Sequence, residues 1–366
     1  MKSLNHLSIL VAAIGLFFSV GLGEKCKALD SAYGAYGFFP QGSARVIAMG
    51  GAFTGLSDDA SASIYNPAGL AMARWSFDFS GDSNRIINKE VDLTGDNKRD
   101  GLPYEAANLS LAARWKNFGF ALGQTDPYNL QFGELSSFST KLGLSLVSQD
   151  ISFAWAPSKM VSLGGTYHLE TAKLSYEVKS SGVSTEDEAS GSYYTVGVLL
   201  RPSRVLQVGL MYRPERLYDI DENLNTVSSS DFFHDVYVPE QTNFGIYIRS
   251  SSKLSWTFDM NTYSSRPALL YVGSAGFQFT DKATTIYRAG FEYAVLNDKD
   301  VEFTWRGGGY QEEPRVVGID SRLHFTMGIA MRWGFITFGA AYDQASDFST
   351  TSQSIGVSVS ALKKEF

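Results

Sequence analysis

The 366-residue sequence predicts an all-β fold: a transmembrane antiparallel β-barrel of about 14 strands with an N-terminal plug, or hatch, inside its lumen. Three observations predict it. Aromatic residues make up 14% of the chain and glycine contributes 35 residues, while only 19% are charged, which is typical of aromatic-rich strands joined by tight turns. From Arg74 onward, large apolar residues occupy every second position in successive short stretches. The connections between these stretches alternate between short and long.

Residues 1–28 are predicted to be a secretory signal peptide. A charged start at Lys2 precedes an apolar stretch from Leu7 to Leu22, and small residues follow. Cleavage after Gly23 and after Ala28 both fit, and we favour Ala28, which removes the single cysteine, Cys26. Lipidation of Cys26 is a weaker alternative because the residues before it are not the small and apolar ones that such a site needs.

Residues 29–73 are predicted to be the plug. The segment is rich in glycine and alanine, as at Gly50 and Gly51, and it lacks sustained strand alternation. Short pieces of small residues pack closely inside a lumen, and Asn66 before Pro67 favours a turn. The alternative is a periplasmic tail outside the barrel.

Residues 74–366 are predicted to form the barrel. Leu109, Leu111 and Trp115 face one way along a strand, whereas Asn108 and Ser110 face the other. A soluble β-sandwich also alternates, but its polar face is usually rich in Lys, Glu and Thr. Here the polar face is rich in glycine, which favours a crowded interior that backbone approaches closely. These glycines are Gly197, Gly209, Gly245, Gly290, Gly328, Gly339 and Gly356.

The connections predict which end of each strand faces the periplasm. Short ones, such as Lys116-Asn117 and Pro202-Ser203, are predicted to be periplasmic turns, and residues 87–105, 180–191 and 215–235 to be external loops. The parity of the apolar residues changes between Leu146 and Ile151, which predicts a β-bulge near residues 148–150. Candidates for aromatic girdles at the membrane interfaces are Trp75, Trp115, Trp155, Tyr212 and Trp333.

The last residue, Phe366, is a further sign of an outer-membrane address. Barrels of Gram-negative outer membranes commonly end on an aromatic residue that the barrel assembly machinery reads. Charged residues 363–365 separate Phe366 from the last alternating stretch, so it is a modest sign.

Motifs near the N-terminus resemble a known family. The motifs are Gly42-Ser43-Ala44-Arg45, Ala48-Met49-Gly50-Gly51-Ala52, Asp58-Asp59-Ala60 and Asn66-Pro67-Ala68-Gly69. They are similar to the hatch of the FadL family of outer-membrane transporters for long-chain fatty acids and other hydrophobic compounds, and residues 238–245, 288–293 and 306–314 resemble its later strands. The Met-Gly-Gly-Ala and Asn-Pro-Ala-Gly-Leu runs also resemble the related PorV-like barrels of type IX secretion.

The resemblance implies a passive diffusion channel in the outer membrane of a Gram-negative bacterium. Its cargo would be hydrophobic small molecules such as long-chain fatty acids, and the cargo would leave sideways through the wall when the hatch shifts. The alternative is a PorV-like barrel that binds exported proteins. Expected partners are a hydrophobic or lipid ligand, outer-membrane lipid, lipopolysaccharide and the barrel assembly machinery.

Candidate site residues follow from this expectation. Asn66, Pro67, Ala68 and Gly69 are the candidate gating residues. Candidate substrate-binding residues are Phe38, Phe39, Arg288, Arg306, Arg332, Leu269, Leu270 and Tyr271. The alternative for the three arginines is pairing with Glu292, Glu302 and Asp343 inside the lumen.

The sequence offers few residues for nucleic-acid binding, catalysis or cofactor binding. A net charge of -7 without a basic block argues against nucleic acid. No enzyme is predicted, because four His and one Cys are few for metal or thiol catalysis; a hydrolase built on His168, His234 or His324 is the weak alternative. No cofactor is required. One partial calcium-loop motif lies in the first external loop, with Asp92, Thr94, Asp96 and Asp100 as ligands, and a solvated acidic turn is its alternative.

Overall fold

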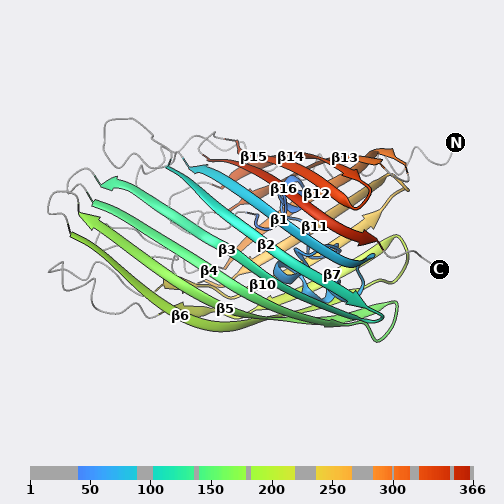
Figure 1. Cartoon of the computed structure of the whole chain (residues 1–366), viewed down its shortest axis with the longest axis horizontal. Coiled ribbons are helices and arrows are strands. Elements are labelled where there is room, and N and C mark those ends of the chain that lie inside the picture. The colour runs from blue at the N-terminus through green and yellow to red at the C-terminus, as the bar shows by residue number, and fades with distance from the viewer. Residues whose placement is uncertain are drawn as a thin grey trace.

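A closed antiparallel β-barrel of fourteen strands makes up most of the described part of the chain (Figure 1). The computed structural model describes residues 40–88, 102–135, 140–178, 183–218, 236–265, 283–298, 301–313, 321–346 and 350–362. The barrel strands are β1 (Trp75–Asn88), β2 (Leu102–Trp115), β3 (Phe118–Leu135), β4 (Thr140–Trp155), β5 (Val161–Val178), β6 (Val183–Leu200), β7 (Leu206–Arg213), β10 (Gln241–Arg249), β11 (Leu254–Tyr263), β12 (Thr284–Asn297), β13 (Val301–Glu312), β14 (Arg322–Trp333), β15 (Ile336–Ala345) and β16 (Thr350–Leu362). Pairing of β1 with β16 closes the ring, so the predicted fold class is confirmed.

The connections divide the barrel into two ends. Residues 116–117, 156–160, 201–205, 250–253 and 334–335 join strands at one end, which we call the short-turn end. The opposite end is the long-loop end. The expected loop over residues 180–191 is wrong there, because β6 begins at Val183 and pairs with β5 as far as Val178. Polar and charged residues concealed this part of the strand in the sequence.

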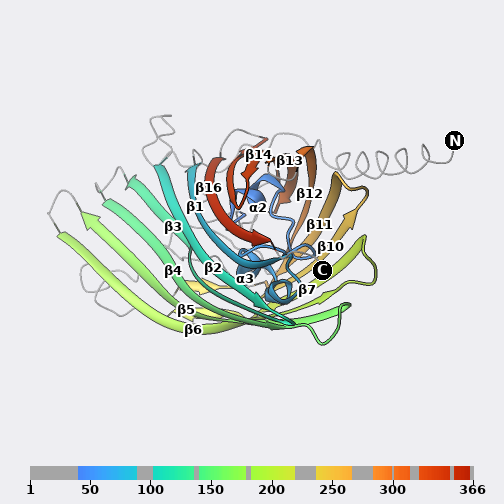
Figure 2. The same ribbon diagram turned by 45° about the vertical axis from the view of Figure 1, so that its right-hand side comes forward.

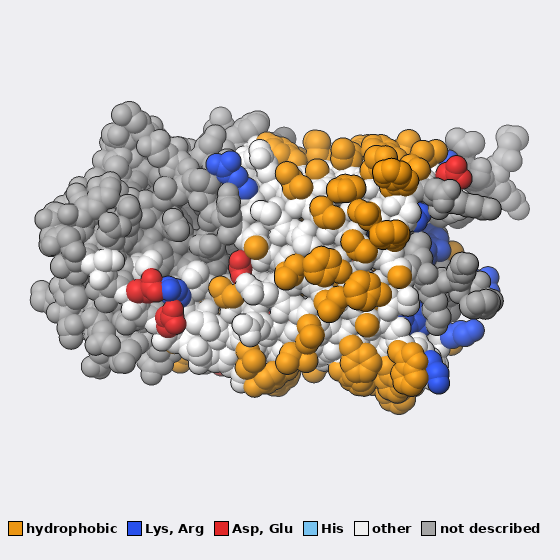
Figure 3. All heavy atoms as spheres, viewed as in Figure 1, with side chains coloured by type: hydrophobic (Ala, Val, Ile, Leu, Met, Phe, Trp, Pro, Cys, Tyr) orange, Lys and Arg blue, Asp and Glu red, His pale blue; other side chains and the backbone are white. Residues whose placement is uncertain are grey.

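The outer face carries an apolar band. Leu109, Leu111 and Trp115 are exposed, whereas Asn108 and Ala112 on the same strand are buried, so the predicted alternation is confirmed. Figure 3 shows the apolar side chains gathered toward the short-turn end, with Lys and Arg side chains beyond them at that edge. An apolar band bordered by charged side chains is the outer surface expected of a β-barrel that spans a lipid bilayer.

Two further sequence predictions are wrong: the position of the Trp75 side chain and a bulge in β4. Trp75 is buried, and its Nε1 donates to the Asp58 carbonyl oxygen at 2.7 Å, so it faces the lumen rather than an interface. β4 contains no bulge, because it pairs with β5 without interruption from Thr140 to Trp155. The apparent change of parity arises because Leu146, an apolar residue, is fully buried on the same face as Asp150.

Residues 40–73, which precede β1, lie within the barrel (Figure 2). We call residues 40–73 the lumenal segment; it contains α2 (Ala44–Ala48), α3 (Ala62–Tyr65) and the short 3-10 helix η1 (Pro67–Ala71). No helix in the described residues is long and apolar enough to cross a membrane.

Glycines on the inner face allow the lumenal segment to pack directly on the wall. A Cβ atom on Gly290 would lie 2.5 Å from the Met49 carbonyl oxygen, and one on Gly328 would lie 2.5 Å from the Ala48 Cβ. Real Cβ atoms do not approach so closely, so only glycine fits at these positions. Close approach by another segment was predicted for the glycine-rich face, and these two contacts agree with it.

Backbone pairing does not seal the wall along its whole height. β2 and β3 pair only from Trp115↔Phe118 to Asn108↔Thr125. At the same level, the pairing of β3 with β4 shifts register between Thr125 and Tyr128, a stretch that contains Pro127. β6 and β7 pair only from Leu200↔Val208 to Val196↔Tyr212. We call the unpaired stretches beyond these last pairs the β2–β3 seam and the β6–β7 seam. Between them, β3 to β6 continue toward the long-loop end as a four-stranded extension, which Figure 1 shows at its left side.

The second seam is closed by side chains of a small hairpin. β8 (Arg216–Tyr218) and β9 (Val236–Val238) continue β7 and β10 after short breaks that contain Pro214 and Pro239. Proline lacks the N–H group that a strand ladder needs. Arg216 lies 3.9 Å over the Tyr193 ring of β6, and the Tyr218 hydroxyl donates to Glu170 of β5.

Candidate functional site

The Asn66-Pro67-Ala68-Gly69 motif ties the lumenal segment to itself and to the wall. Asn66 Nδ2 donates to the carbonyl oxygens of Thr54 and Val198, each at 3.0 Å, and its Oδ1 accepts from the Ala68 N–H at 3.2 Å. Pro67 begins η1, where its missing N–H costs nothing. Asn66 is 0% exposed, and its bonds with Thr54 and Ala68 are buried, whereas the bond to Val198 is partly buried.

Three aspartates of the wall accept hydrogen bonds from the backbone of the lumenal segment. Asp82 accepts from the Ala44 N–H at 2.9 Å, at the first residue of α2. Asp78 accepts from the Ala60 N–H at 2.8 Å. Asp259 accepts from the N–H groups of Phe53 and Thr54 at 3.0 and 2.8 Å. These carboxylates satisfy buried donors that short helices and turns leave unpaired.

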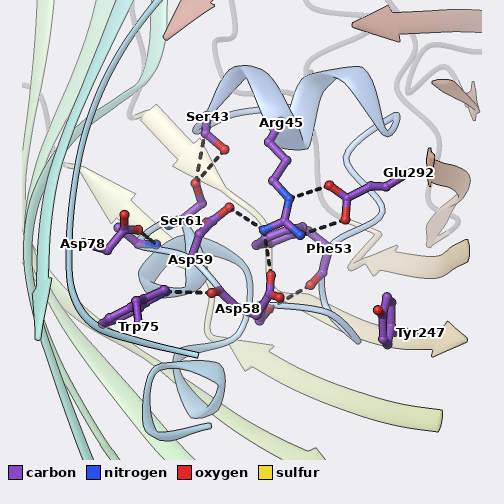
Figure 4. A network of polar contacts seen from close by, with 12 residues as sticks. Ser43, Arg45, Phe53, Asp58, Asp59, Ser61, Trp75, Asp78, Tyr247 and Glu292 are labelled. Carbon is purple, nitrogen blue, oxygen red and sulfur yellow. Dashed lines mark hydrogen bonds and ion pairs between the residues drawn. The ribbon is translucent and has the colours of Figure 1, made fainter. Parts of the chain in front are cut away.

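Arg45 is the centre of a network of charges (Figure 4). Its guanidinium lies 2.7 Å from an oxygen of Asp58, 3.1 Å from one of Asp59, and 2.7 and 2.8 Å from the two oxygens of Glu292 on β12. Arg306 of β13 lies 2.8 Å from the same Glu292. The network therefore links the lumenal segment to the wall by charge as well as by packing.

Burial changes the ionisation of this network. Burial raises the pKa of Asp59 to about 6, even though the Arg45 guanidinium opposes the shift, and the nearby carboxylates of Asp78 and Asp58 raise it further. Burial by itself would lower the pKa of Arg45, but Asp58 and Glu292 together raise it well above its ordinary value. Arg45 therefore stays charged while Asp59 titrates in an accessible range of pH.

A cavity of about 370 Å³ lies beside this network. It reaches toward the short-turn end, where residues 251–254 of the β10–β11 turn line it. Six basic residues (Arg45, Arg74, Arg249, Lys253, Arg306 and Arg332) and six acidic residues (Asp58, Asp59, Asp78, Asp82, Glu292 and Glu302) are among its lining. Charged groups dominate this lining, although Trp75, Leu254 and Val357 also contribute to it, so an alkyl chain that filled the cavity would bury charged groups at a cost in free energy.

The three candidate arginines do not form a common site. Arg306 and Arg332 both line the charged cavity, where Arg306 pairs with Glu292 and Arg332 lies 2.9 Å from Glu302. Arg288 instead donates to the Gly50 carbonyl oxygen and to Asn261 Oδ1, each at 3.0 Å. Their contacts are those of residues that fix the lumenal segment and balance charge.

The remaining candidates lie outside the described residues. These are the substrate-binding candidates Phe38, Phe39, Leu269, Leu270 and Tyr271, the calcium candidates Asp92, Thr94, Asp96 and Asp100, and the signal peptide. Among the described residues, no group of three or more His, Cys, Asp or Glu is placed to hold a metal ion.

One buried cluster has the connectivity of a catalytic triad. Thr195 Oγ1 lies 2.8 Å from His168 Nε2, and His168 Nδ1 lies 2.6 Å from Asp150 Oδ1. Thr195 is 0% exposed, however, and its oxygen also accepts from Arg213. A nucleophile needs a path for its substrate, so this cluster acts in the described conformation as a brace between β4, β5, β6 and β7.

Sequence reasoning missed the residues that hold the lumenal segment most directly. Asp78, Asp82 and Asp259 were not candidates, and neither was Arg45, although the family-like motifs contain it. A carboxylate at an inward position of a strand that otherwise carries small residues is a usable signal. What it binds depends on a partner more than 200 residues away in the case of Asp259 and Thr54.

The fold and lumen define a class: a β-barrel whose own N-terminal segment is held across its interior. Several solved structures resemble the chain in fold. A FadL homologue of Pseudomonas aeruginosa matches with a TM-score of 0.66 at 12% identity, covering 89% of this chain and 99% of that one. The CymD monoaromatic hydrocarbon channel matches at 0.63 and 14% identity, covering 90% and 99%. The toluene transporter TbuX of Ralstonia pickettii matches at 0.62 and 15% identity, covering 88% and 98%.

At these identities the likeness shows the fold, and the chain has the fold of FadL-type barrels. No family model matches the sequence, and no curated protein matches it.

Proposed function

We propose that this protein is a passive channel for hydrophobic small molecules, such as long-chain fatty acids, in the outer membrane of a Gram-negative bacterium. Similar structures described as a monoaromatic hydrocarbon channel and a toluene transporter support a hydrophobic cargo. The apolar band on the outer face supports a bilayer as the surroundings.

The observation that carries the proposal is that β2 and β3 are unpaired over part of their length while the lumenal segment fills the interior of the barrel. The lumenal segment packs on inner-face glycines and is held by the Arg45 network, so it lies in the path along the barrel axis. The β2–β3 seam, in contrast, has no backbone pairing beyond Asn108↔Thr125 within the described residues. A sideways exit there requires no strand hydrogen bond to break.

Polarity gives a second reason for a sideways exit. An alkyl chain that continued along the axis would have to cross the charged cavity, where burying it would displace water from twelve charged groups. An alkyl chain that leaves through the wall enters hydrocarbon directly. In this proposal Leu269, Leu270 and Tyr271 capture cargo outside, and Phe38 and Phe39 line its internal path.

The Asn66-Pro67-Ala68-Gly69 motif acts in this proposal as the hinge of the gate. Asn66 joins Thr54 in the lumenal segment to Val198 in the wall, so a shift of either one changes the same side chain. Displacement of the segment from β6 would change the space beside the open seam. No energy source is needed, because cargo moves down its own gradient.

A cross-link across the open seam tests the proposal. The Ala107 N–H donates to Asp126 Oδ2 at 3.2 Å, so these residues face each other directly beyond the last pair of the ladder. We expect a disulfide between Ala107→Cys and Asp126→Cys to reduce uptake of a fluorescent long-chain fatty acid into reconstituted vesicles by about tenfold, with recovery on reduction. The matched control is Ser110→Cys with Gly123→Cys, which joins the same strands at a pair that is already in register.

Unchanged uptake in the oxidised seam variant would exclude exit at this seam. Failure of the unmodified barrel to bind or admit any hydrophobic probe would exclude the channel function itself. Loss of uptake in the control variant would show that the cross-link acts through general rigidity rather than through the seam.

One observation favours the alternative function of binding exported proteins. The four-stranded extension of β3 to β6 has strand edges that pair with no other barrel strand in the described residues beyond Thr125 and Val196. Unpaired strand edges are common sites of β-strand addition by a partner. Co-purification of exported proteins, lost when this extension is shortened, would favour that function.

A further inference from the structure

Three turns at the short-turn end repeat one local arrangement. Ser158-Lys159-Met160 and Ser203-Arg204-Val205 each follow a proline, and Ser251-Ser252-Lys253-Leu254 repeats the pattern with one residue more. Each has a serine, then a basic residue, then an apolar residue. The three turns join β4 to β5, β6 to β7, and β10 to β11.

The serine braces the turn in every case. Ser158 Oγ accepts from the Met160 and Val161 N–H groups, each at 3.2 Å, and Ser203 Oγ accepts from the Val205 N–H at 3.3 Å. Ser251 Oγ accepts from the N–H groups of Lys253 and Leu254 at 3.2 and 3.0 Å. Such side-chain bonds fix a turn that the backbone alone would leave open, so the basic residue is presented in a set direction.

The basic residues presented in this way are exposed and unpaired. Lys159, Arg204 and Lys253 are exposed, and Lys116 is exposed in the β2–β3 turn, where its Nζ lies 4.7 Å over the Trp115 ring. None of the four makes an ion pair within the described residues. The turns that carry them, residues 116–117, 156–160, 201–205 and 250–253, contain no Asp or Glu, although the chain as a whole carries a net charge of -7. We call these four residues the basic arc.

The apolar partners place the basic arc at the edge of the membrane band. Met160 is 56% exposed and Val205 is 52% exposed, directly beside Lys159 and Arg204. Exposed Trp115 and Trp155 lie at the same end of their strands. An apolar side chain next to a cation matches the boundary where acyl chains meet phosphates, and each Lys or Arg near an anionic leaflet adds attraction.

We propose that the basic arc binds the phosphate groups of anionic phospholipids in the leaflet at the short-turn end. A lipid fits better than a protein because the four turns follow the rim from β2 to β11 and each ends in an apolar residue or adjoins an exposed tryptophan. This inference rests on the membrane location in the proposed function. It assigns the basic turns a role that transport does not use.

Tryptophan quenching by brominated phospholipid tests the inference. The full barrel is reconstituted in vesicles that contain a trace of brominated phosphatidylglycerol or, separately, of brominated phosphatidylcholine, and quenching reports which lipid gathers near the exposed tryptophans. We expect at least about threefold preference for phosphatidylglycerol, weakened by salt. The double variant Lys159→Gln with Arg204→Gln should lose most of it. The matched control is Arg85→Gln with Lys173→Gln, an exposed base and a half-buried, ion-paired base that lie toward the long-loop end.

Each outcome has one meaning. Equal quenching by both lipids in the unmodified barrel, or equal loss of preference in both double variants, overturns the inference and leaves the channel function standing. Loss of preference on adding inorganic phosphate at constant ionic strength would mean that the arc binds free phosphate instead. A barrel that enters no vesicle at all contradicts the proposed membrane function, and the inference fails with it.

Discussion

Asn66 and Arg45 hold the lumenal segment by different physics. Asn66 uses three hydrogen bonds, two of them fully buried, whose donors and acceptors would cost free energy if they were left unpaired. Arg45 uses charge, and its carboxylate partners stand on both the segment and the wall. Removing either side chain leaves buried partners unsatisfied, so both positions are expected to tolerate substitution poorly.

Asp59 gives the lumenal segment a dependence on pH. Its pKa is raised from 3.8 to about 6 by burial and by Asp78 and Asp58, with Arg45 opposing. A raised pKa means that the packed state favours the protonated form, so this contribution to stability is fully present below about pH 4 and is lost as the pH rises through about 6. We expect the segment to be held more firmly at pH 5 than at pH 7.5, by about 1 kcal/mol.

Labelling of a buried reporter thiol at Ser63→Cys measures this effect, with each rate divided by that of the denatured protein at the same pH. Asp59→Asn should flatten the pH profile, because an amide does not titrate. The amide oxygen can still accept the Ser61 N–H bond that Asp59 Oδ1 accepts at 2.9 Å, so the local structure is kept. An unchanged profile in Asp59→Asn would assign the pH dependence to another group.

At the scale of single elements, the inner face of each strand is shaped by what lies against it. β12 carries Gly290 where the Met49 backbone crosses it, whereas β15 carries Gly339 where a Cβ would meet the Ala44 Cβ at an ordinary 3.5 Å. The two glycines look alike in the sequence. Only one of them is required by close packing.

This difference gives a matched pair of substitutions. Gly290→Ala should loosen the lumenal segment by about 2 kcal/mol because its Cβ overlaps backbone that has no room to move. Gly339→Ala, also on the inner face, should change stability by less than about 0.5 kcal/mol. Rates of labelling of the Ser63→Cys reporter give the segment's stability in both, and equal effects of the two substitutions would contradict the packing argument.

At the scale of the whole molecule, the wall closes without the lumenal segment. Every strand of the barrel is hydrogen-bonded to both of its neighbours, and the pairs that close the ring, between β1 and β16, run from Trp75↔Leu362 to Asn88↔Thr350. We therefore expect a chain that lacks residues 40–73 to fold as a barrel, although the wall aspartates lose their donors.

Single-channel conductance checks this expectation. Deletion of the segment should raise the conductance of the barrel in a planar bilayer by about tenfold, because water and ions then fill the lumen. Arg45→Met should give a smaller increase with frequent transient openings, because Asp58, Asp59 and Glu292 lose their common cation. Conductance that is unchanged by the deletion would mean that the segment does not block the path.

The accuracy of the sequence predictions depended on how local their cause was. The outward faces were predicted correctly because alternation is a property of each strand taken alone, as at Leu109 and Leu111. Trp75 was misplaced because its partner, the Asp58 carbonyl, belongs to a different element. Leu146 suggested a bulge because an apolar inward residue looks the same as an outward one when the far side of the lumen is unknown.

By itself, the sequence determined the class of the fold. A period of two, a glycine-rich inner face and turns of alternating length are local patterns, and a chain with these patterns satisfies its backbone in a membrane only by closing into a barrel. The tertiary structure decided what each inward side chain binds. Asp259 contacts Thr54, Glu292 contacts Arg45, and the backbone pairing of β2 with β3 ends at Thr125. These contacts between distant segments depend on where the closed wall brings the segments together.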